Sequence, residues 1–326
     1  MSIRALALVS GGLDSLLAAK LIQNQGIEVI GIHFRIPFCK LDPAESFAQA
    51  KIELLQFDLG QEFLELLKHP RYGFGSNMNP CIDCKILMFA KAKELLTDLK
   101  ADFIISGEVL GQRPMSQNKQ ALRLIKERSG LGQLLLRPLS AKFFAPSLAE
   151  KSGWVKPEAL LNFNGRRRGE QTQLAQKLGI VKYAYPAGGC LLTDPSFSKR
   201  LRELLSHQEL NLENLKLLKV GRHFRVGENA RLVVGRDAQE NNLLLQLAIE
   251  EDYLFSPEIK FAGPTVLMRG VSTPELFNLA LEITAAYSDT AGFKEIKVCS
   301  RRFPDSRDKE YQVVCLAKSK FVPLLI

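Results

Sequence analysis

The feature that most constrains this fold is a glycine loop between an apolar run and an amphipathic helix. The apolar run is residues 5–9, the loop Ser-Gly-Gly-Leu-Asp-Ser is residues 10–15, and a second apolar run follows at residues 29–32. Leucines recur at helical spacing after the loop, which predicts a helix over about residues 15–24, and Gly26 follows it where helix ends favour glycine. Strand, helix and strand at this spacing form a βαβ unit. We therefore expect an α/β fold with a doubly wound parallel sheet.

The chain is long enough for two domains, with 326 residues of which 46% are hydrophobic. A second helix is predicted after a pair of cysteines, and it leads into a buried strand at residues 103–105. Beyond residue 208 we expect a smaller α+β domain with one helix opened by Pro274. Its predicted strands are 217–220, 231–234, 265–268, 296–298 and 312–316. The predicted domains are therefore residues 1–208 and 209–326.

Composition bounds the partners and the compartment. Lys and Arg number 44 against 35 Asp and Glu, a formal charge of +9, which weakly favours a polyanionic partner. The longest apolar runs fall far short of the ~20 residues that a membrane span needs, so no membrane contact is expected. The chain opens without a signal-peptide pattern, which predicts a cytoplasmic protein. Six cysteines in such a chain point to metal or catalytic use.

The glycine loop has the composition of a phosphate site. Two glycines admit a ligand close to the backbone, and free amides at a helix start attract anions. The loop lacks the Lys of a Walker A motif and the third glycine of a dinucleotide fingerprint. The structural alternative is a strand–helix turn that only needs glycine.

The pattern S-G-G-x-D-S resembles the pyrophosphate loop of the PP-loop ATP pyrophosphatases, which have an adenine nucleotide alpha hydrolase-like fold. The resemblance implies that ATP is cleaved between its α and β phosphates. It places the leaving pyrophosphate on Gly11 and Gly12 with the hydroxyls of Ser10 and Ser15, and it lets Asp14 position Mg²⁺.

A second motif narrows the substrate. Residues 106–117 read S-G-E-x-L-G-Q-x-x-x-S-Q and resemble T-G-E-x-x-G-Q-x-x-S-Q of the tRNA 4-thiouridine synthases, with one extra residue before Ser116. The resemblance covers about residues 3–195. It implies that ATP adenylates a nucleobase oxygen, which sulfur then replaces, and it adds Gly107 and Gln112 to the ATP site. His33 is predicted at the end of the second strand near the adenine or ribose, with a packed core histidine as the alternative.

The cysteines suggest where sulfur is held. Cys81 and Cys84 form a C-x-x-C pair after Asn-Pro, and Cys190 follows two glycines far downstream. This set resembles the tRNA 2-thiouridylases and related enzymes, whose three cysteines can hold a [4Fe-4S] cluster. A metal-free persulfide relay, a zinc site completed by His69 or Cys39, and a purely structural pair remain alternatives. Cys39, Cys299 and Cys315 are otherwise interpreted as core or incidental thiols.

Basic groups predict RNA contacts, with solvated surface charges as the alternative. Some interleave arginine with an aromatic or imidazole ring, as RNA-binding surfaces do. Residues 221–224, 234–237 and 263–269 resemble successive motifs of the NFACT-R domain, an RNA-associated module, over about residues 210–326. The predicted RNA-binding residues are Arg166, Arg167, Arg168, Arg222, His223, Arg225, Arg236, Arg301 and Arg302.

Together these motifs predict an ATP-dependent tRNA sulfurtransferase that makes a 4-thiouridine- or 2-thiouridine-type product and releases AMP and pyrophosphate. The predicted catalytic residues are Asp14, Cys81, Cys84 and Cys190. ATP, Mg²⁺, tRNA and a sulfur donor, either a cysteine desulfurase or free sulfide, are the expected partners. A PP-loop enzyme acting on a small metabolite and a non-catalytic RNA-binding adaptor are the rival hypotheses.

Overall fold

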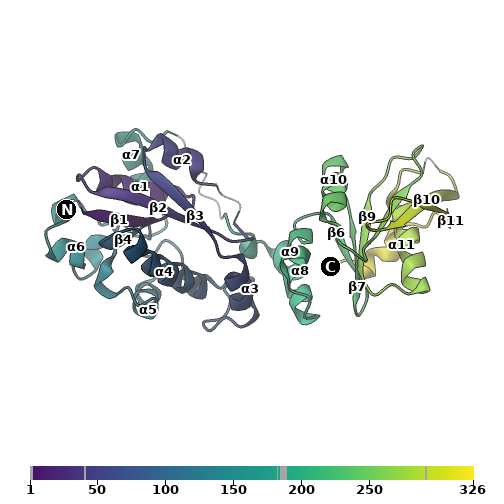
Figure 1. Cartoon of the computed structure of the whole chain (residues 1–326), viewed down its shortest axis with the longest axis horizontal. Helices are drawn as coiled ribbons and strands as arrows, with labels where there is room; N and C mark the ends of the chain where they lie inside the picture. The colour runs from purple at the N-terminus through teal and green to yellow at the C-terminus, as the bar shows by residue number, and fades with distance from the viewer. Residues whose placement is uncertain (1–2, 40–41, 182, 184–188, 291) are drawn as a thin grey trace. The chain divides into compact units, whose positions relative to one another are not determined.

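The chain forms two compact units, residues 1–194 and 195–326, each described here by itself (Figure 1). The computed structural model describes residues 3–39, 42–181, 183, 189–290 and 292–326. The boundary lies before helix α8 (Pro195–Ser206) rather than near residue 208. Helix α8 belongs to the second unit because its side chains bond there: Arg200 Nε donates to the carbonyl of Leu218 at 3.2 Å, and Glu203 pairs with Arg225.

The first unit is built on a five-stranded parallel sheet in the order β3-β2-β1-β4-β5. Leu6 in the central strand pairs with Ile30 on one side and Ile104 on the other. The predicted doubly wound parallel sheet is therefore confirmed. Its strands are β1 (Arg4–Leu8), β2 (Glu28–Arg35), β3 (Glu53–Asp58), β4 (Phe103–Ser106) and β5 (Leu135–Leu136).

Helices cover both faces of this sheet, as Figure 1 shows. Ala5 and Ala7 contribute to the core beside α1, whereas Leu6 between them contributes to the core beside α4. This alternation follows from the period of two residues in a strand, which sends successive side chains to opposite faces. The helices are α1 (Leu13–Gln23), α2 (Ala44–Gln49), α3 (Gly60–Lys68), α4 (Cys81–Asp98), α5 (Lys119–Arg128), α6 (Leu148–Lys151) and α7 (Gly169–Lys177), with short 3-10 turns η1 (Gly132–Leu134), η2 (Ala141–Phe143), η3 (Pro157–Ala159) and η4 (Leu191–Thr193).

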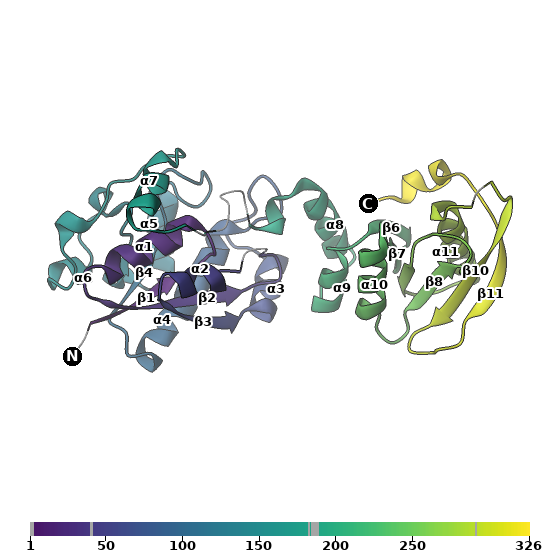
Figure 2. The ribbon, with the colours of Figure 1, turned by 90° about the horizontal axis from the view of Figure 1, so that it is seen from above.

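The second unit is an α+β domain with a six-stranded antiparallel sheet in the order β11-β10-β8-β9-β7-β6 (Figure 2). Helix α11 packs on one face over Phe224 and Phe255, while Leu244 of α10 belongs to a core that includes Val233 and Leu267. Besides α8, its elements are α9 (Leu212–Leu217), β6 (Arg222–Gly227), β7 (Ala230–Val234), α10 (Ala238–Leu247), β8 (Tyr253–Pro257), β9 (Val266–Gly270), α11 (Pro274–Tyr287), β10 (Glu295–Arg302), β11 (Lys309–Val314) and η5 (Lys318–Leu324).

Two sequence expectations for the second unit were wrong. Residues 217–220 are not a strand, because Asn211 caps α9 by accepting a hydrogen bond from the Asn214 amide and Leu217 ends that helix. Helices α9 and α10 and strands β6 and β8 were not predicted. The Asp237 side chain caps the start of α10 by accepting a hydrogen bond from the Glu240 amide. The apolar run at residues 243–245 lies within this helix and gave no clear helical period. None of the helices in the described part of the chain is long and apolar enough to cross a membrane.

Candidate active site

The glycine loop lies at the carboxyl end of β1, directly before α1. Gly11 has φ +79°, in the left-handed region, and Gly12 is the extended residue that precedes the helix. The loop therefore presents backbone amides at the start of α1, which is the positive end of the helix dipole. Ser15 Oγ donates to the Gly12 carbonyl at 2.8 Å, so this hydroxyl stabilises the loop itself, while Ser10 is exposed.

The segment after β4 packs directly on this loop. A Cβ at Gly107 would lie closer than 3.0 Å to the backbone of Asp14 and Ser15, a distance that real Cβ atoms do not show. Glycine is therefore required at this position. The close approach brings the predicted second motif against the first, as the resemblance implied.

Asp14 is held from that same segment. Gln112 Nε2 donates to Asp14 Oδ2 at 3.0 Å, while Asp14 Oδ1 is buried without a hydrogen-bond partner among the described residues. Burial raises the pKa of Asp14, against the lowering influence of Gln112, Arg168 and Arg113. An unpaired buried carboxylate oxygen beside an anion nest has the chemistry of a magnesium ligand, so these residues fit Mg²⁺.

Replacing Gly107 by alanine should displace the glycine loop and weaken ATP binding by at least about tenfold, because the new methyl group overlaps backbone that cannot rotate away. Isothermal titration with ATP measures the change. Gly169→Ala is the matched control, since a Cβ there meets nothing within 4 Å. Equal ATP affinity in the two variants would contradict the assigned contact.

The segment that carries the arginine triplet at residues 166–168 packs against the segment after β4. Gly165 N donates to the Leu110 carbonyl at 2.7 Å, and Asn164 pairs with Leu110 in a parallel bridge. Arg168 then precedes α7, and its charge acts on Asp14. At least one arginine of the predicted RNA-binding set is thus a neighbour of the nucleotide loop.

Glu108 is a buried residue whose contacts could not be predicted from the motif. Its carboxylate pairs with Lys85 of α4 and accepts a hydrogen bond from Arg137 Nε at 2.7 Å. Arg137 Nη2 also donates to the Leu122 carbonyl at 3.1 Å. Burial alone would raise the pKa of Glu108, but the two cations lower it below its usual range. This charged cluster ties α4, β4, α5 and the end of β5 together, which positions the segment that carries Gln112.

The structure brings the three predicted cysteines and Cys39 into one neighbourhood. Cys39 and Cys190 form an isolated antiparallel bridge, and Leu191 N donates to the Phe38 carbonyl at 2.9 Å. Burial raises the pKa of Cys84, and Cys190, Cys81 and Cys39 raise it further. Burial likewise raises the pKa of Cys190 to about 11. Cys39 was interpreted as incidental or as a zinc ligand, and its place beside Cys190 could not be seen from sequence spacing.

The two members of the C-x-x-C pair lie in the first turn of α4, not before it. Asn79 Nδ2 donates to Cys81 Sγ at 3.1 Å. Asp83 between the cysteines is buried and accepts from the amides of Arg71 and Tyr72 at 3.0 and 3.1 Å. The Asp side chain therefore holds the preceding loop, and the Asn side chain orients a thiol.

These thiols have the donor chemistry of an iron–sulfur or zinc site, yet their side chains do not converge on one. Within the described ranges, no group of three or more His, Cys, Asp or Glu is arranged to hold a metal ion. The glycine turn predicted to present Cys190 lies partly outside the described residues, which omit 184–188.

Arg113 links the two halves of the site. It is exposed, and its guanidinium lowers the pKa of both Asp14 and Cys190 against the effect of their burial. The glycine loop and the cluster of cysteines around Cys190 therefore both lie within electrostatic reach of the Arg113 side chain. His33, in contrast, is 5% exposed within β2, and its Nδ1 lies 2.9 Å from the Val9 carbonyl, which gives it a core partner.

The predicted RNA-binding residues of the second unit divide into buried and exposed groups. His223 is only 2% exposed and hydrogen-bonds the Val220 carbonyl through Nε2 at 2.8 Å, so it has a packing role in place of the predicted RNA contact. Arg225 is tied to Glu203 and Glu209. The described positions therefore correct the prediction for His223 and leave Arg225 neutralised.

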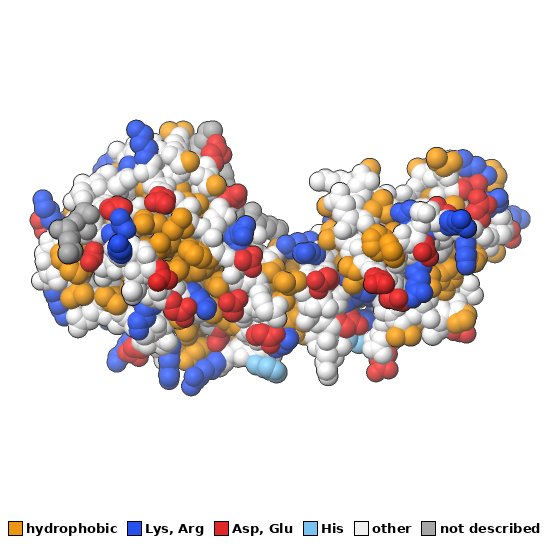
Figure 3. Space-filling view, in the orientation of Figure 1, with side chains coloured by type: hydrophobic (Ala, Val, Ile, Leu, Met, Phe, Trp, Pro, Cys, Tyr) orange, Lys and Arg blue, Asp and Glu red, His pale blue; other side chains and the backbone are white. Residues whose placement is uncertain are grey.

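The exposed members keep some capacity for RNA. Arg222 lies over the Tyr287 ring, with 5.5 Å between the guanidinium carbon and the ring centroid. Arg236 Nε donates to Glu240 at 2.9 Å and Arg302 pairs with Glu251, whereas Arg301 is half-buried. On the face in Figure 3, acidic side chains are interspersed with basic ones, so the net charge is not concentrated there.

His223 should make the protein sensitive to acid. Burial, together with Arg200 and Arg231, lowers its pKa from 6.5 to about 3. Below pH 6.5 the His223 imidazole binds a proton in the unfolded state but stays neutral in the folded state. The free energy of unfolding therefore falls as the pH drops from about 6.5 towards 3. Between pH 7 and pH 5 the unfolding free energy should fall by about 2 kcal/mol more than in His223→Gln, as measured by urea denaturation. Equal pH dependence in both proteins would contradict the buried neutral imidazole.

Comparison with known proteins agrees with this division of the chain. Residues 1–142 match the family model "Thiamine biosynthesis protein (ThiI)", and residues 221–322 match "NFACT protein RNA binding domain". A tRNA-specific 2-thiouridylase MnmA of Petrotoga mobilis is 25% identical over 291 residues, covering 77% of this chain and 76% of that protein.

Two further matches cover less of the proteins concerned. A probable tRNA sulfurtransferase of Thermococcus kodakarensis is 27% identical over 146 residues, 42% of this chain and 36% of that protein. A solved 4-thiouridine synthetase–RNA complex with bound ATP has 20% identity and a TM-score of 0.37, covering 66% of this chain and 52% of that one. The first part of the chain is therefore similar to the ThiI family over residues 1–142 and the second part to the NFACT RNA-binding domain over residues 221–322, and the two named relatives are described as tRNA thiolation enzymes.

Proposed function

We propose that this protein is an ATP-dependent tRNA sulfurtransferase. The observation that carries the proposal is that one segment contacts both the glycine loop and the cysteines. Gln112 Nε2 donates to Asp14 Oδ2 at 3.0 Å, and Asn79 Nδ2 lies 3.7 Å from Met115 Sδ while it donates to Cys81 Sγ at 3.1 Å. Replacing a carbonyl oxygen by sulfur needs both an activating site and a sulfur site, and the reactants must be held in contact. The named relatives, a 2-thiouridylase and a probable tRNA sulfurtransferase, support the same reaction class.

In the first step the nucleobase oxygen attacks the α-phosphorus of ATP. An O–P bond forms, the bond from the α-phosphorus to the bridging oxygen breaks, and pyrophosphate leaves. The amides at Gly11 and Gly12 are placed to receive the charge that develops on the leaving group, and Asp14 would hold Mg²⁺. Gln112 fixes the Asp14 carboxylate through one oxygen and leaves the other for the ion.

In the second step sulfur attacks the activated carbon, a C–S bond forms, and AMP leaves with the original oxygen. We assign the receipt and delivery of sulfur to Cys81, Cys84 and Cys190. With a cysteine desulfurase as the donor, one cysteine receives the sulfur as a persulfide and the outer sulfur attacks the carbon; a second cysteine then attacks the inner sulfur, which breaks the S–S bond and releases the thiocarbonyl, and an external thiol reduces the disulfide that remains. Free sulfide would instead be held beside these cysteines as HS⁻ and attack the carbon without forming an S–S bond. Asn79 would orient the sulfur of Cys81 through its amide donor. A [4Fe-4S] cluster held by three thiolates would leave one iron open for a sulfide. In the described part of the chain these side chains do not converge on a metal site, so the cysteines themselves are assigned the sulfur step.

Which ring position is thiolated follows from how RNA enters the site. The RNA-binding contribution is proposed for the second unit, where Arg222, Arg236, Arg301 and Arg302 have exposed or half-buried side chains. Arg166, Arg167 and Arg168 would contact RNA beside the nucleotide loop. A cytoplasmic location follows from tRNA as the substrate.

The test is pyrophosphate release from ATP with and without unmodified tRNA, paired with thionucleoside analysis of the recovered tRNA. The proposal expects release that tRNA stimulates and a thionucleoside that depends on added sulfide. Release without RNA stimulation would instead favour a small-metabolite substrate. No release under any condition would favour the RNA-binding adaptor. Iron content and the absorption spectrum after anaerobic purification distinguish a cluster from metal-free thiols.

A further inference from the structure

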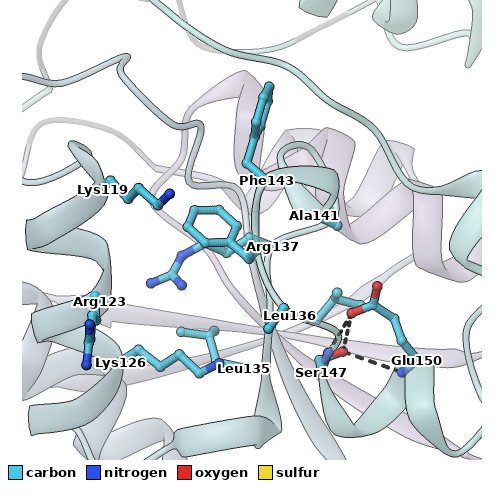
Figure 4. A pocket seen from close by; sticks show the side chains of 12 residues that line it. Lys119, Arg123, Lys126, Leu135, Leu136, Arg137, Ala141, Phe143, Ser147 and Glu150 are labelled. Carbon is cyan, nitrogen blue, oxygen red and sulfur yellow. Dashed lines mark hydrogen bonds between the residues drawn. The ribbon is translucent and has the colours of Figure 1, made fainter.

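A basic pocket lies along edge strand β5, apart from the glycine loop and the cysteines, and it shares Arg137 with the Glu108 cluster (Figure 4). Its volume is about 350 Å³, within the range of ligand pockets. The side chains of Lys119, Arg123 and Lys126 come from α5, and Lys119 extends towards Arg137. On the other side Phe143 stands above Arg137, and Leu135 and Leu136 form part of the lining.

Two of the four cations that line this pocket have no carboxylate partner among the described residues. Neither Lys119 nor Lys126 has a carboxylate within ion-pair distance among the described residues, and Arg123 pairs only with Glu127 on the exposed helix surface. Glu150, the acid in the lining, accepts from the Ser147 amide and hydroxyl at 2.7 Å, which commits it to capping α6. Burial lowers the pKa of Lys126, and the charges of Arg137 and Lys151 lower it further, against the raising influence of Glu150 and Glu127. Lys119 and Lys126 therefore place positive charge beside the paired Arg137 without an ion-pair partner of their own among the described residues, an arrangement that an anionic ligand would relieve.

The pocket also offers aromatic surface. Phe143 is 38% exposed, although a phenylalanine usually buries more of its ring. Phe144 lies against Arg137, with 5.5 Å between the guanidinium carbon and the ring centroid. Arg137 is itself held by Glu108, so its plane is fixed between the ring and the carboxylate. The lysines could contact a phosphate, and the planar groups beside them could contact the base that is joined to it.

We propose that this pocket binds one nucleotide of a single-stranded RNA segment, with Lys119 and Lys126 on the phosphate and Phe143 stacked on the base. Proteins hold single strands in this way, with cations along the backbone and aromatic rings under the bases. The choice of RNA rests on the proposed function, which requires a tRNA on the enzyme. The pocket would hold a nucleotide other than the one being thiolated, because its residues are separate from the glycine loop and the cysteines.

Charge reversal tests the phosphate contact on the full chain. Lys119→Glu/Lys126→Glu should weaken binding of a short fluorescein-labelled single-stranded RNA by about tenfold or more. The slope of log K against log salt should become shallower by about 1.4, for two lost phosphate contacts. The matched control is Lys156→Glu/Lys177→Glu, which changes the net charge equally at two exposed lysines outside the pocket. Equal weakening by the control would overturn the proposal, since general electrostatics would then explain it.

The aromatic contact predicts a different signature. Phe143→Ala should weaken the same RNA by about tenfold with an unchanged salt slope, because a stacking contact releases no counterions. Ultraviolet crosslinking of a 5-bromouridine oligonucleotide should label the peptide that contains Phe143, and AMP should compete poorly. Crosslinks confined to residues 195–326, or competition by AMP as strong as by RNA, would each overturn the proposal.

The two proposals can fail separately. A pocket crosslink that Phe143→Ala removes, in a protein that forms no thionucleoside, would keep the RNA site and reject the reaction. Thiolation that proceeds normally in Lys119→Glu/Lys126→Glu, with unchanged RNA affinity, would keep the reaction and reject the pocket. Melting temperatures of all variants confirm folding before either result is used.

Discussion

Replacing Asp14 by alanine is expected to lower the rate of pyrophosphate release from ATP by at least about a thousandfold. The side chain supplies the buried carboxylate oxygen that lacks a partner among the described residues, next to the amides that receive the leaving group. Fold stability should not suffer, because burial already disfavours the charged carboxylate and raises its pKa. Steady-state release at saturating ATP and Mg²⁺ is the measurement.

Two further variants sharpen this result. Asp14→Asn keeps an oxygen that can accept from Gln112 but removes the charge, so it should lose activity almost as fully. Asp98→Ala is the matched control, since Asp98 is exposed at the end of α4. Full activity and unchanged Mg²⁺ dependence in Asp14→Asn would show that the carboxylate does not hold the ion.

Replacing Cys190 by serine should leave tRNA-dependent pyrophosphate release within about twofold of wild type and reduce thionucleoside formation below detection. Serine has nearly the same shape, but its hydroxyl cannot serve as a soft sulfur carrier. Mass spectrometry of nucleosides from tRNA incubated with ATP and sulfide measures the second step, and pyrophosphate release measures the first. We expect only thionucleoside formation to be lost, because the glycine loop serves the first step and the cysteines serve the second.

Cys299→Ser is the control for this experiment, because Cys299 lies in β10 of the second unit. It should retain both activities. Normal thionucleoside levels in Cys190→Ser would remove Cys190 from the sulfur site, and loss of pyrophosphate release would show that it supports the nucleotide loop instead.

The prediction of the first unit succeeded where local rules are strong. A glycine loop between an apolar strand and an amphipathic helix is compatible with few folds other than a strand–helix–strand unit. Strands β1 and β2 and helix α1 lie where the pattern predicted them. The second unit was harder. Residues 217–220 have strand-like composition but complete a capped helix turn, because the capping of α9 by Asn211 outweighs their β propensity.

The candidate site shows the same division. Asp14, Cys81, Cys84 and Cys190 could be proposed from short motifs because each stands in a recognisable local context. His223 could not be judged in the same way: its arginine neighbours suggested RNA, whereas the packing of its unit buried it.

The sequence by itself determined the parallel α/β fold of the first unit, the place of the glycine loop and the division into two kinds of domain. Each of these depends on residues close together in the chain. Only the tertiary structure decided that Gly107 must be glycine, that Glu108 joins Lys85 to Arg137, and that Cys39 lies beside Cys190. Those contacts join segments far apart in sequence, and their geometry is set by how the strands and helices pack, which no local pattern encodes.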